Sequence, residues 1–272
     1  MNASTHDWLV GKHALVTGAS SGIGKELSKN LVGICRRLTL IARNTRAQLD
    51  VLKKELADMQ AKRGITPATA IDCRSLDVRD IAGTTNLIRR IYESEKAQID
   101  VFINCAGGSH VYSTLESMTH EDIERIFDTN AKAPLFWLRE LLPRMKTNIM
   151  KPGSLKRAHV LLLSSRSGER TLPKLSIYTA AKGAVEKIAE AMQKEYAQYR
   201  IVFTLVNPGS ISTAFTADWA EETRNAHNEE SMTVEEAVVP ILQALQSQCA
   251  INKVSYESVE QWLNEPGVIR DR

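Results

Sequence analysis

A tyrosine and a lysine stand four residues apart in the segment SIYTAAKGAVEK, at Tyr178 and Lys182. At the start of a helix, this spacing places both side chains on one face. A free tyrosine has a pKa near ~10, which is too high for easy proton exchange at neutral pH. A neighbouring ammonium group favours the phenolate and lowers that pKa. The pair is therefore suited to acid/base chemistry, although the spacing alone is common by chance.

Two further polar residues support this interpretation. Ser165 precedes Tyr178 by thirteen residues and ends an expected strand. Asn130 lies in FDTNA, inside a long helical stretch. Because asparagine is unfavourable in a helix interior, we expect its side chain to be present for its hydrogen bonds. Asn130 and Ser165 thus accompany Tyr178 and Lys182, and Ser165 is expected to finish at the same edge of the sheet as the pair.

A glycine-rich segment, TGASSGIG, runs from Thr17 to Gly24, between the first expected strand and the first expected helix. Gly18 permits a tight turn, while Gly22 and Gly24 let the backbone approach a pyrophosphate and let the helix pack on the strand. The amides at the helix start then face the anion. Since strand and helix flank the motif as required, it predicts a dinucleotide-binding loop.

The second expected strand ends at Ala42 and is followed by Arg43. A cofactor with a free ribose 2′-hydroxyl usually meets an acidic residue at this point. A guanidinium group instead binds a 2′-phosphate through charge-assisted hydrogen bonds. The sequence thus favours NADP(H) over NAD(H), with Ser20 adding a hydroxyl. The alternative is that Arg43 is only a surface arginine at the start of a helix.

The elements that must position these residues alternate along the chain. The apolar runs VFIN and VLLL are typical of parallel strands buried on both faces. Expected strands cover 13–17, 38–42, 70–76, 100–104, 159–164 and 201–207, and expected helices cover 22–33, 44–63, 80–96, 119–149 and 177–199. This order predicts a single-domain, Rossmann-like α/β fold, a doubly wound parallel sheet with helices on both faces.

The domain limits follow from the same pattern. We expect residues 1–11 to form an N-terminal extension and residues 12–272 to form one domain. Within it, residues 210–232 follow an Asn-Pro-Gly break and are polar, apart from isolated aromatic residues. Ligands of open α/β sheets bind at the carboxyl ends of the strands. We therefore expect 210–232 to be a mobile segment that covers the substrate.

Composition excludes several other classes of protein. The 272 residues are 43% hydrophobic and 25% charged, as in ordinary globular domains. A net charge of +3 gives no support to nucleic-acid binding. No apolar run approaches the ~18 residues that cross a bilayer, and no signal peptide is recognisable. The four cysteines are far apart, which predicts free thiols, no metal site and a cytoplasmic location.

Taken together, the motifs resemble a known family. T-G-x-x-x-G-x-G, N-C-A-G, N, S-S, Y-x-x-x-K and N-P-G occur in this order within residues 12–213. The set resembles the classical short-chain dehydrogenases/reductases. The resemblance implies that Tyr178 donates or accepts the proton and that Lys182 holds the nicotinamide ribose and lowers the Tyr178 pKa. It also implies that Ser165 binds the substrate carbonyl oxygen and that Asn130 positions a water in a proton relay.

The resemblance extends to the cofactor site. Cys105 replaces the second asparagine of the family's NNAG, and Asp77 matches the acid beside the adenine. The segment from Pro208 to Thr213 matches the part that closes over the nicotinamide carboxamide. The expected cofactor-binding residues are Gly18, Ser20, Ser21, Gly22, Ile23, Gly24, Arg43, Asn44, Asp77, Val78, Asn104, Ala106, Gly107, Tyr178, Lys182, Pro208, Gly209, Ile211 and Thr213.

The predicted function is an NADP(H)-dependent oxidoreductase that interconverts a carbonyl and an alcohol on a small molecule. The alternatives are an NAD(P)-linked alcohol dehydrogenase acting oxidatively and a non-catalytic NADP(H)-binding regulator. The intact serine, tyrosine and lysine set argues against a pure regulator. Residues expected around the substrate are Ser109, His110, Arg166, Thr171, Leu172, Leu175, Phe215 and Trp219. For His110 we expect a loop histidine facing solvent, with a substrate contact as the alternative. For Arg166 we expect a surface or structural role, with contact to a substrate carboxylate as the alternative.

The C-terminus departs from the family pattern. Many members end in a glycine-rich tail that builds a tetramer, and this chain has no such tail. We expect a homodimer through helices 131–149 and 178–199, with a tetramer or a monomer left open. A short seventh strand is expected around Lys253–Tyr256.

Overall fold

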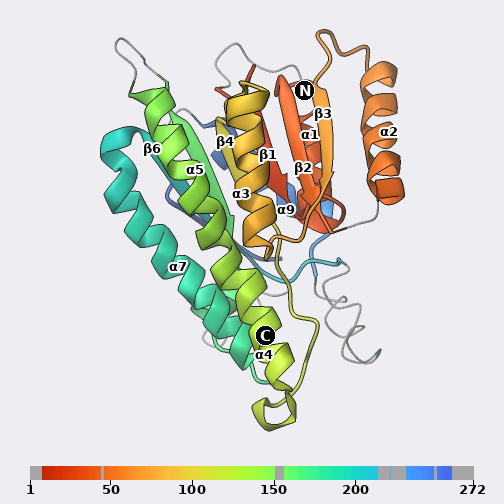
Figure 1. Ribbon diagram of the computed structural model, residues 1–272. Coiled ribbons are helices and arrows are strands. Elements are labelled where there is room, and N and C mark those ends of the chain that lie inside the picture. Colours follow the sequence, from red (N-terminus) through yellow and green to blue (C-terminus); the bar gives the residue numbers. More distant parts are fainter. Residues whose placement is uncertain are drawn as a thin grey trace, which may run out of the picture.

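One parallel sheet organises the chain. The computed structural model describes residues 8–43, 46–150, 156–213, 221, 231–247 and 250–258. Its seven-stranded sheet has the order β3-β2-β1-β4-β5-β6-β7, and helices lie on both faces (Figure 1). Each pair of neighbouring strands is parallel. The predicted fold class is therefore confirmed.

The elements have the following bounds. The strands are β1 (His13–Thr17), β2 (Arg37–Ala42), β3 (Ala70–Ser75), β4 (Val101–Asn104), β5 (Ala158–Leu163), β6 (Ile201–Pro208) and β7 (Lys253–Tyr256). The α-helices are α1 (Gly22–Leu31), α2 (Arg46–Lys62), α3 (Ile81–Arg89), α4 (His120–Phe127), α5 (Ala133–Ile149), α6 (Arg166–Glu169), α7 (Ser176–Tyr196) and α9 (Val234–Gln246). Shorter helical turns are η1 (Arg90–Ser94), η2 (Leu115–Ser117), η3 (Asp128–Lys132) and η4 (Ala197–Tyr199).

Both faces of the sheet are buried, as the continuous apolar strands predict. Successive strand residues point to opposite faces. In β4, Phe102 packs into one cluster, with Trp137 of α5 stacked on it at 5.8 Å between ring centroids. Val101 and Ile103 pack into the other cluster, beneath α1, α2 and α9. Because the sheet is clamped from both sides, the loops at its ends have a rigid base.

The strand order places a cleft at one edge. From β1, the chain continues through β2 and β3 to one side and through β4, β5, β6 and β7 to the other. The loops after β1 and β4 therefore leave the sheet side by side and in opposite senses. Such a switch point is where open α/β sheets bind ligands. We call this end, where the strands finish, the carboxyl edge, and the opposite end the amino edge.

The structure also divides one expected helix. The stretch 119–149 separates into α4, the π-helical turn η3 and α5. Inside η3, the Asn130 amide donates a hydrogen bond to the backbone oxygen of Ile126 at 2.8 Å. The side chain thus takes up an acceptor within the helix, at the point where the helix is widened. A helical sequence pattern does not distinguish the two windings.

The expected seventh strand is present as β7, at the end of the sheet beside β6. The expected covering segment lies largely outside the described residues, as do most of the N-terminal extension, Asn44, Phe215 and Trp219. No helix within the described ranges is both long and apolar enough to cross a bilayer.

Candidate active site

A cavity of about 890 Å³ opens at the carboxyl edge. It is formed by the loops that follow β1, β2, β4, β5 and β6 and by the first turns of α7. It brings together most of the predicted site residues, namely Gly18, Ser20, Ser21, Gly22, Ile23, Gly24, Arg43, Val78, Ala106, Gly107, Ser165, Tyr178, Lys182, Pro208, Gly209, Ile211 and Thr213.

The glycine-rich loop packs where no side chain fits. Gly18 has φ +70°, and a Cβ there would lie 2.8 Å from the backbone nitrogen of Ala106, in the loop after β4. A Cβ on Gly24 would lie 2.3 Å from the carbonyl oxygen of Gly18. The glycines therefore allow the two loops and the start of α1 to meet at the switch point.

The start of α1 is open toward the cavity. Ser21 is the N-cap residue, and its side chain makes no capping hydrogen bond. Ser21, Gly22 and Ile23 all line the cavity. Amides in the first turn of a helix have no partner within the helix and favour an anion. This part of the cavity fits the pyrophosphate of a dinucleotide.

Arg43 lines the same cavity at the end of β2, together with Ala42 and Gln48. Val78 also lines it, whereas Asp77 does not. Asp77 forms an ion pair with Arg79 at 2.8 Å. Hydrogen bonding from Arg79 is the main reason that the pKa of the Asp77 carboxyl lies below its usual value. In the described geometry Asp77 thus serves the local loop, and its cofactor contact stays a prediction.

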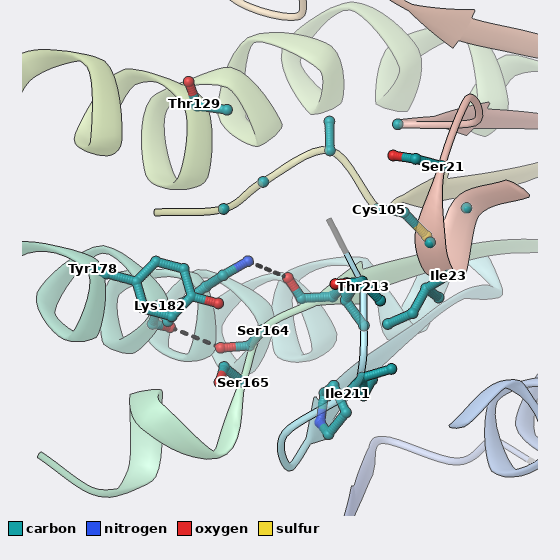
Figure 2. Close-up of a pocket in the computed structure, with 18 of the residues that line it drawn as sticks. Ser21, Ile23, Cys105, Thr129, Ser164, Ser165, Tyr178, Lys182, Ile211 and Thr213 are labelled. Carbon is teal, nitrogen blue, oxygen red and sulfur yellow. Dashed lines mark hydrogen bonds between the residues drawn. The ribbon is translucent and has the colours of Figure 1, made fainter. Parts of the chain in front are cut away.

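Ser165, Tyr178 and Lys182 meet on one side of the cavity. Ser165 follows β5 and is the N-cap residue of α6, where its Oγ accepts a hydrogen bond from the Ser167 backbone N–H at 3.1 Å. Tyr178 and Lys182 project from the first turns of α7, both buried. Figure 2 shows these three residues together, with Ser21, Ile23 and Cys105 across from them. The structure thus assembles the predicted trio.

Burial dominates the proton affinities of the pair. It raises the pKa of the Tyr178 phenol above its usual value, and a hydrogen bond with Ser165 acts in the opposite direction. Burial also lowers the pKa of Lys182 to about 8. The Lys182 Nζ donates a hydrogen bond to the Leu163 carbonyl oxygen at 2.9 Å and lies 5.6 Å from the centroid of the Tyr178 ring.

These values correct one prediction. The sequence spacing suggested that Lys182 lowers the Tyr178 pKa, but in this geometry the phenol is held in its neutral form. The reason is that desolvation penalises the phenolate more than its neighbours favour it. The hydrogen bond with Ser165 opposes desolvation, and support of the phenolate by Lys182 during turnover stays a prediction.

Asn130 is buried outside the cavity lining, and its side chain fastens the loop after β4. Its amide nitrogen donates to the Gly108 carbonyl oxygen at 2.8 Å, and its Oδ1 accepts from the Gly108 N–H at 2.9 Å. The expectation that this residue is present for its hydrogen bonds is confirmed. Its part in a water relay stays a prediction.

Asn104 also lies outside the cavity lining. It is buried at the end of β4, where its Oδ1 accepts a hydrogen bond from the Thr17 hydroxyl at 3.0 Å. It therefore joins the two strands that flank the switch point. A cofactor contact by Asn104 stays a prediction.

The substrate side of the cavity matches the sequence only in part. Arg166, Leu172 and Leu175 line it, whereas Ser109, His110 and Thr171 do not. His110 instead lies 3.0 Å from a carboxylate oxygen of Asp122. Residues that also line the cavity, and that sequence reasoning missed, include Gln48, Thr129, Ser164, Arg170 and Glu257.

Of these missed residues, Arg170 has a signal in the sequence and Glu257 does not. Arg170 follows Arg166 by four residues, a spacing that places two side chains on the same face of a helical turn. Glu257 follows the last strand and carries no comparable signal. No group of three His, Cys, Asp or Glu side chains within the described residues is placed to hold a metal ion.

Comparison with known proteins gives three kinds of match. The family model for short chain dehydrogenases matches residues 12–224. Dehydrogenase/reductase SDR family member 7B of Xenopus tropicalis is 29% identical over 239 residues, which cover 85% of this chain and 73% of that protein. The 3-ketodihydrosphingosine reductase of Bos taurus is 30% identical over 206 residues, which cover 75% of this chain but only 58% of that protein.

The solved structures show the same architecture. The 3-ketoacyl-(acyl-carrier-protein) reductase from Brucella melitensis, complexed with NADH, superimposes with a TM-score of 0.77 at 21% identity. The match covers 93% of this chain and 99% of that one. At this level of identity the likeness shows the fold alone.

Proposed function

The chain belongs to the short-chain dehydrogenase/reductase family, whose members are nicotinamide-dependent oxidoreductases, and we propose that it is an NADP(H)-dependent reductase interconverting a carbonyl and an alcohol. The observation that carries the proposal is the meeting of Ser165, Tyr178 and Lys182 in a cavity that also contains an open helix N-terminus. The glycine cradle and the uncapped start of α1 fit a dinucleotide. When bound, that cofactor supplies or removes the hydride.

The residues of the chain then handle the substrate oxygen and its proton. The Ser165 and Tyr178 hydroxyls are already hydrogen bonded to each other, and together they bind the carbonyl oxygen. Because burial keeps the Tyr178 phenol protonated, it is ready to donate its proton as the oxygen becomes an alkoxide. In the oxidative direction, the same hydroxyl accepts the proton.

Lys182 supports the tyrosine after the proton has left. With a pKa of about 8, its amine is mostly protonated at neutral pH. A positive charge beside the Tyr178 ring stabilises the phenolate formed during turnover. Lys182 Nζ donates one hydrogen bond to the Leu163 carbonyl oxygen. An ammonium group has three donors, so another can bind a ribose hydroxyl, as the family resemblance implies.

The choice of NADP(H) rests on Arg43. Its position at the end of β2, in the lining of the cavity, supports contact with a 2′-phosphate. The Brucella melitensis structure holds NADH, so the family fold alone does not select the cofactor. A small-molecule substrate, a homodimer through α5 and α7 and a cytoplasmic location complete the proposal. Cross-linking and sedimentation would test the dimer.

The decisive experiment is Tyr178→Phe. We expect NADPH oxidation with a panel of carbonyl compounds in the wild type, and a loss of about 10²–10⁴-fold in the variant, because its ring cannot donate a proton. NADPH affinity, measured by fluorescence titration, should stay within a few-fold. Comparable turnover in both proteins would remove Tyr178 from the mechanism. NADPH binding without any turnover in the wild type would favour the regulator.

A further inference from the structure

We propose that Glu169 is a positioning residue: its carboxylate ties the segment that carries Ser165 to the ends of β6 and β7, and it thereby sets where the Ser165 hydroxyl lies beside Tyr178. This inference rests on the proposed reductase function. Glu169 is the last residue of α6, and Ser165 is the N-cap residue of the same helix. Glu169 itself does not line the cavity. Its effect on the reaction therefore passes through other residues.

The helix α6 is too short to hold Ser165 by itself. It has four residues. The Gly168 N–H donates to the Ser165 carbonyl oxygen at 2.9 Å, and the Ser167 N–H donates to the Ser165 Oγ at 3.1 Å. Helices of this length are not stable without tertiary contacts. The place of the Ser165 hydroxyl must therefore be fixed by what α6 packs against.

The Glu169 carboxylate joins α6 to the last two strands of the sheet. Its Oε1 accepts hydrogen bonds from Asn207 Nδ2 and from the Ser255 hydroxyl, each at 3.0 Å, and lies 2.6 Å from Lys253 Nζ. Asn207 and Ser255 are opposite each other in the pairing of β6 with β7. The other oxygen, Oε2, lies 2.7 Å from Nη1 of Arg166, the residue that follows the catalytic serine. One carboxylate thus connects both strands to the start of α6.

The helix α7, which carries the catalytic tyrosine and lysine, holds another side of α6. A Cβ on Gly168 would lie 2.6 Å from Glu186 Oε1 and 3.1 Å from the carbonyl carbon of Lys182. Glu186 Oε1 also accepts a hydrogen bond from Asn207 Nδ2 at 2.9 Å. Since an amide nitrogen has two hydrogens, Asn207 can serve Glu169 and Glu186 at once. The serine segment, α7 and β6 therefore meet at one amide group.

The ionisation state of Glu169 suits this role. Burial acts to raise the pKa of its carboxyl, but hydrogen bonds from Lys253, Asn207 and Ser255 together outweigh burial, so the pKa lies below its usual value. The group is therefore a carboxylate at neutral pH, and its hydrogen bonds are charge-assisted. Only 19% of the Glu169 side chain is exposed, and Asn207 is completely buried. Removal of the carboxylate would leave a buried N–H of Asn207 without its acceptor.

The kinetic test compares four variants with the wild type, using NADPH and the best ketone of the carbonyl panel. Glu169→Ala removes the carboxylate. Glu169→Gln keeps an oxygen that can accept from Asn207 and Ser255. Lys253→Met removes only the ion pair. Glu55→Ala is the control, because Glu55 also pairs with a lysine, at 2.8 Å, but lies on α2 and does not line the cavity.

We expect kcat per folded molecule to fall by about ten- to a hundred-fold in Glu169→Ala, because a catalytic group displaced by about 1 Å can cost that much. Glu169→Gln should stay within a few-fold of the wild type, and Lys253→Met should lose a few-fold. Glu55→Ala should behave as the wild type. NADPH affinity should stay within a few-fold throughout. Equal turnover in Glu169→Ala and Glu55→Ala would overturn the inference.

A double-mutant cycle with Ser165→Ala separates positioning from a general structural role. If Glu169 acts through the Ser165 hydroxyl, Glu169→Ala should cause almost no further loss of kcat once that hydroxyl is gone. Losses that multiply would show that Glu169 acts independently of Ser165 and would overturn the inference. Lys253→Met goes through the same cycle. Because the Lys253 side chain is 46% exposed, this variant keeps the test decisive if Glu169→Ala does not fold.

Crystal structures of the variants separate this inference from the reductase function. In Glu169→Ala, the Ser165 Oγ should move by about 1 Å relative to the Tyr178 hydroxyl, the size of displacement that affects turnover. In Glu55→Ala it should stay in place. If Ser165 moves but the wild type reduces no ketone, the positioning role stands and the reductase function fails. If the wild type is active and Ser165 does not move, the positioning role is wrong and the reductase function stands.

Discussion

The two edges of the sheet bury polar side chains in different ways. At the amino edge, His13 in β1 and His159 in β5 are almost completely buried. The Nε2 of each lies within hydrogen-bond distance of a threonine on the neighbouring strand, Thr39 at 2.9 Å and Thr204 at 2.8 Å. At the carboxyl edge, Tyr178 and Lys182 are equally buried but border a cavity. Burial of a polar group is thus no sign of function unless there is space beside it.

Desolvation has different consequences for the titrating side chains at the two edges. Desolvation lowers the pKa of His13 to about 4 and of His159 to about 3, so both imidazoles are neutral at physiological pH. Desolvation lowers the pKa of Lys182 only to about 8, near the pH at which a proton must move. At the amino edge burial removes a charge from the titration range, and at the carboxyl edge it brings one closer to that range.

The largest test of this contrast is Lys182→Met. We expect turnover to fall by about 10²–10⁴-fold, because the charge that supports the Tyr178 phenolate is lost. The melting temperature should fall by only a few degrees, since the variant loses one hydrogen bond but no longer buries an amine. Steady-state kinetics and calorimetry would check both. A large loss of stability with normal specific activity would show that Lys182 resembles the amino-edge histidines.

The next test concerns the adenosine end of the carboxyl edge. Arg43→Ala should weaken NADPH binding by about ten- to a hundred-fold, because a charge-assisted hydrogen bond is lost. NADH binding should stay nearly constant. Fluorescence titrations at two salt concentrations would measure both, and the NADPH effect should shrink at high salt. If NADPH and NADH lost affinity equally, Arg43 would be only a surface residue, and the argument for NADP(H) would fail.

The last test concerns the pH dependence of stability at the amino edge. The folded-state pKa values of about 4 and 3 lie below the unfolded value of 6.5. Between these limits the unfolded chain binds more protons, so stability is complete above pH 6.5 and is lost as the pH falls. From pH 6.5 to 5, each histidine should cost up to about 2 kcal/mol.

Urea unfolding at pH 5 and at pH 7.5 would measure this loss. His159→Gln, whose amide can still reach Thr204, should flatten the profile, while kcat per folded molecule stays unchanged. A profile equally steep in His159→Gln would place the acid sensitivity elsewhere. A change in kcat would show that the buried histidine at the amino edge affects turnover at the carboxyl edge, which would contradict the distinction drawn between the two edges.

The sequence predicts the frame of the site better than its chemistry. Continuous apolar strands and the glycines at 18, 22 and 24 determine the sheet and the loop at its switch point, because both effects are local. Asn104 and Asn130 illustrate the limit of such reasoning. The family motifs give Asn104 a cofactor contact and Asn130 a water relay, but they do not predict that these side chains bind Thr17 and Gly108.

Tertiary contacts account for the other differences. The spacing of Tyr178 and Lys182 indicates that they are neighbours, but not how strongly burial shifts their pKa values. Glu257 reaches the cavity only because β7 pairs with β6. Nothing in its own segment predicts that it would lie near Arg166 and Arg170.

The short bridge beside the cavity has a consequence for how the chain tolerates changes of length. Ile211 pairs with Met232, the Ser212 N–H donates to the Met232 carbonyl oxygen at 2.9 Å, and the Met232 N–H donates to Ser210 O at 3.0 Å. Immediately afterwards, Thr233 and Glu236 form a capping box that starts α9 independently. Both ends of the intervening stretch are thus clasped together at its base. Because the bridge and the capping box lie at the two ends of the stretch, a change of length between them leaves the register of the sheet to other contacts.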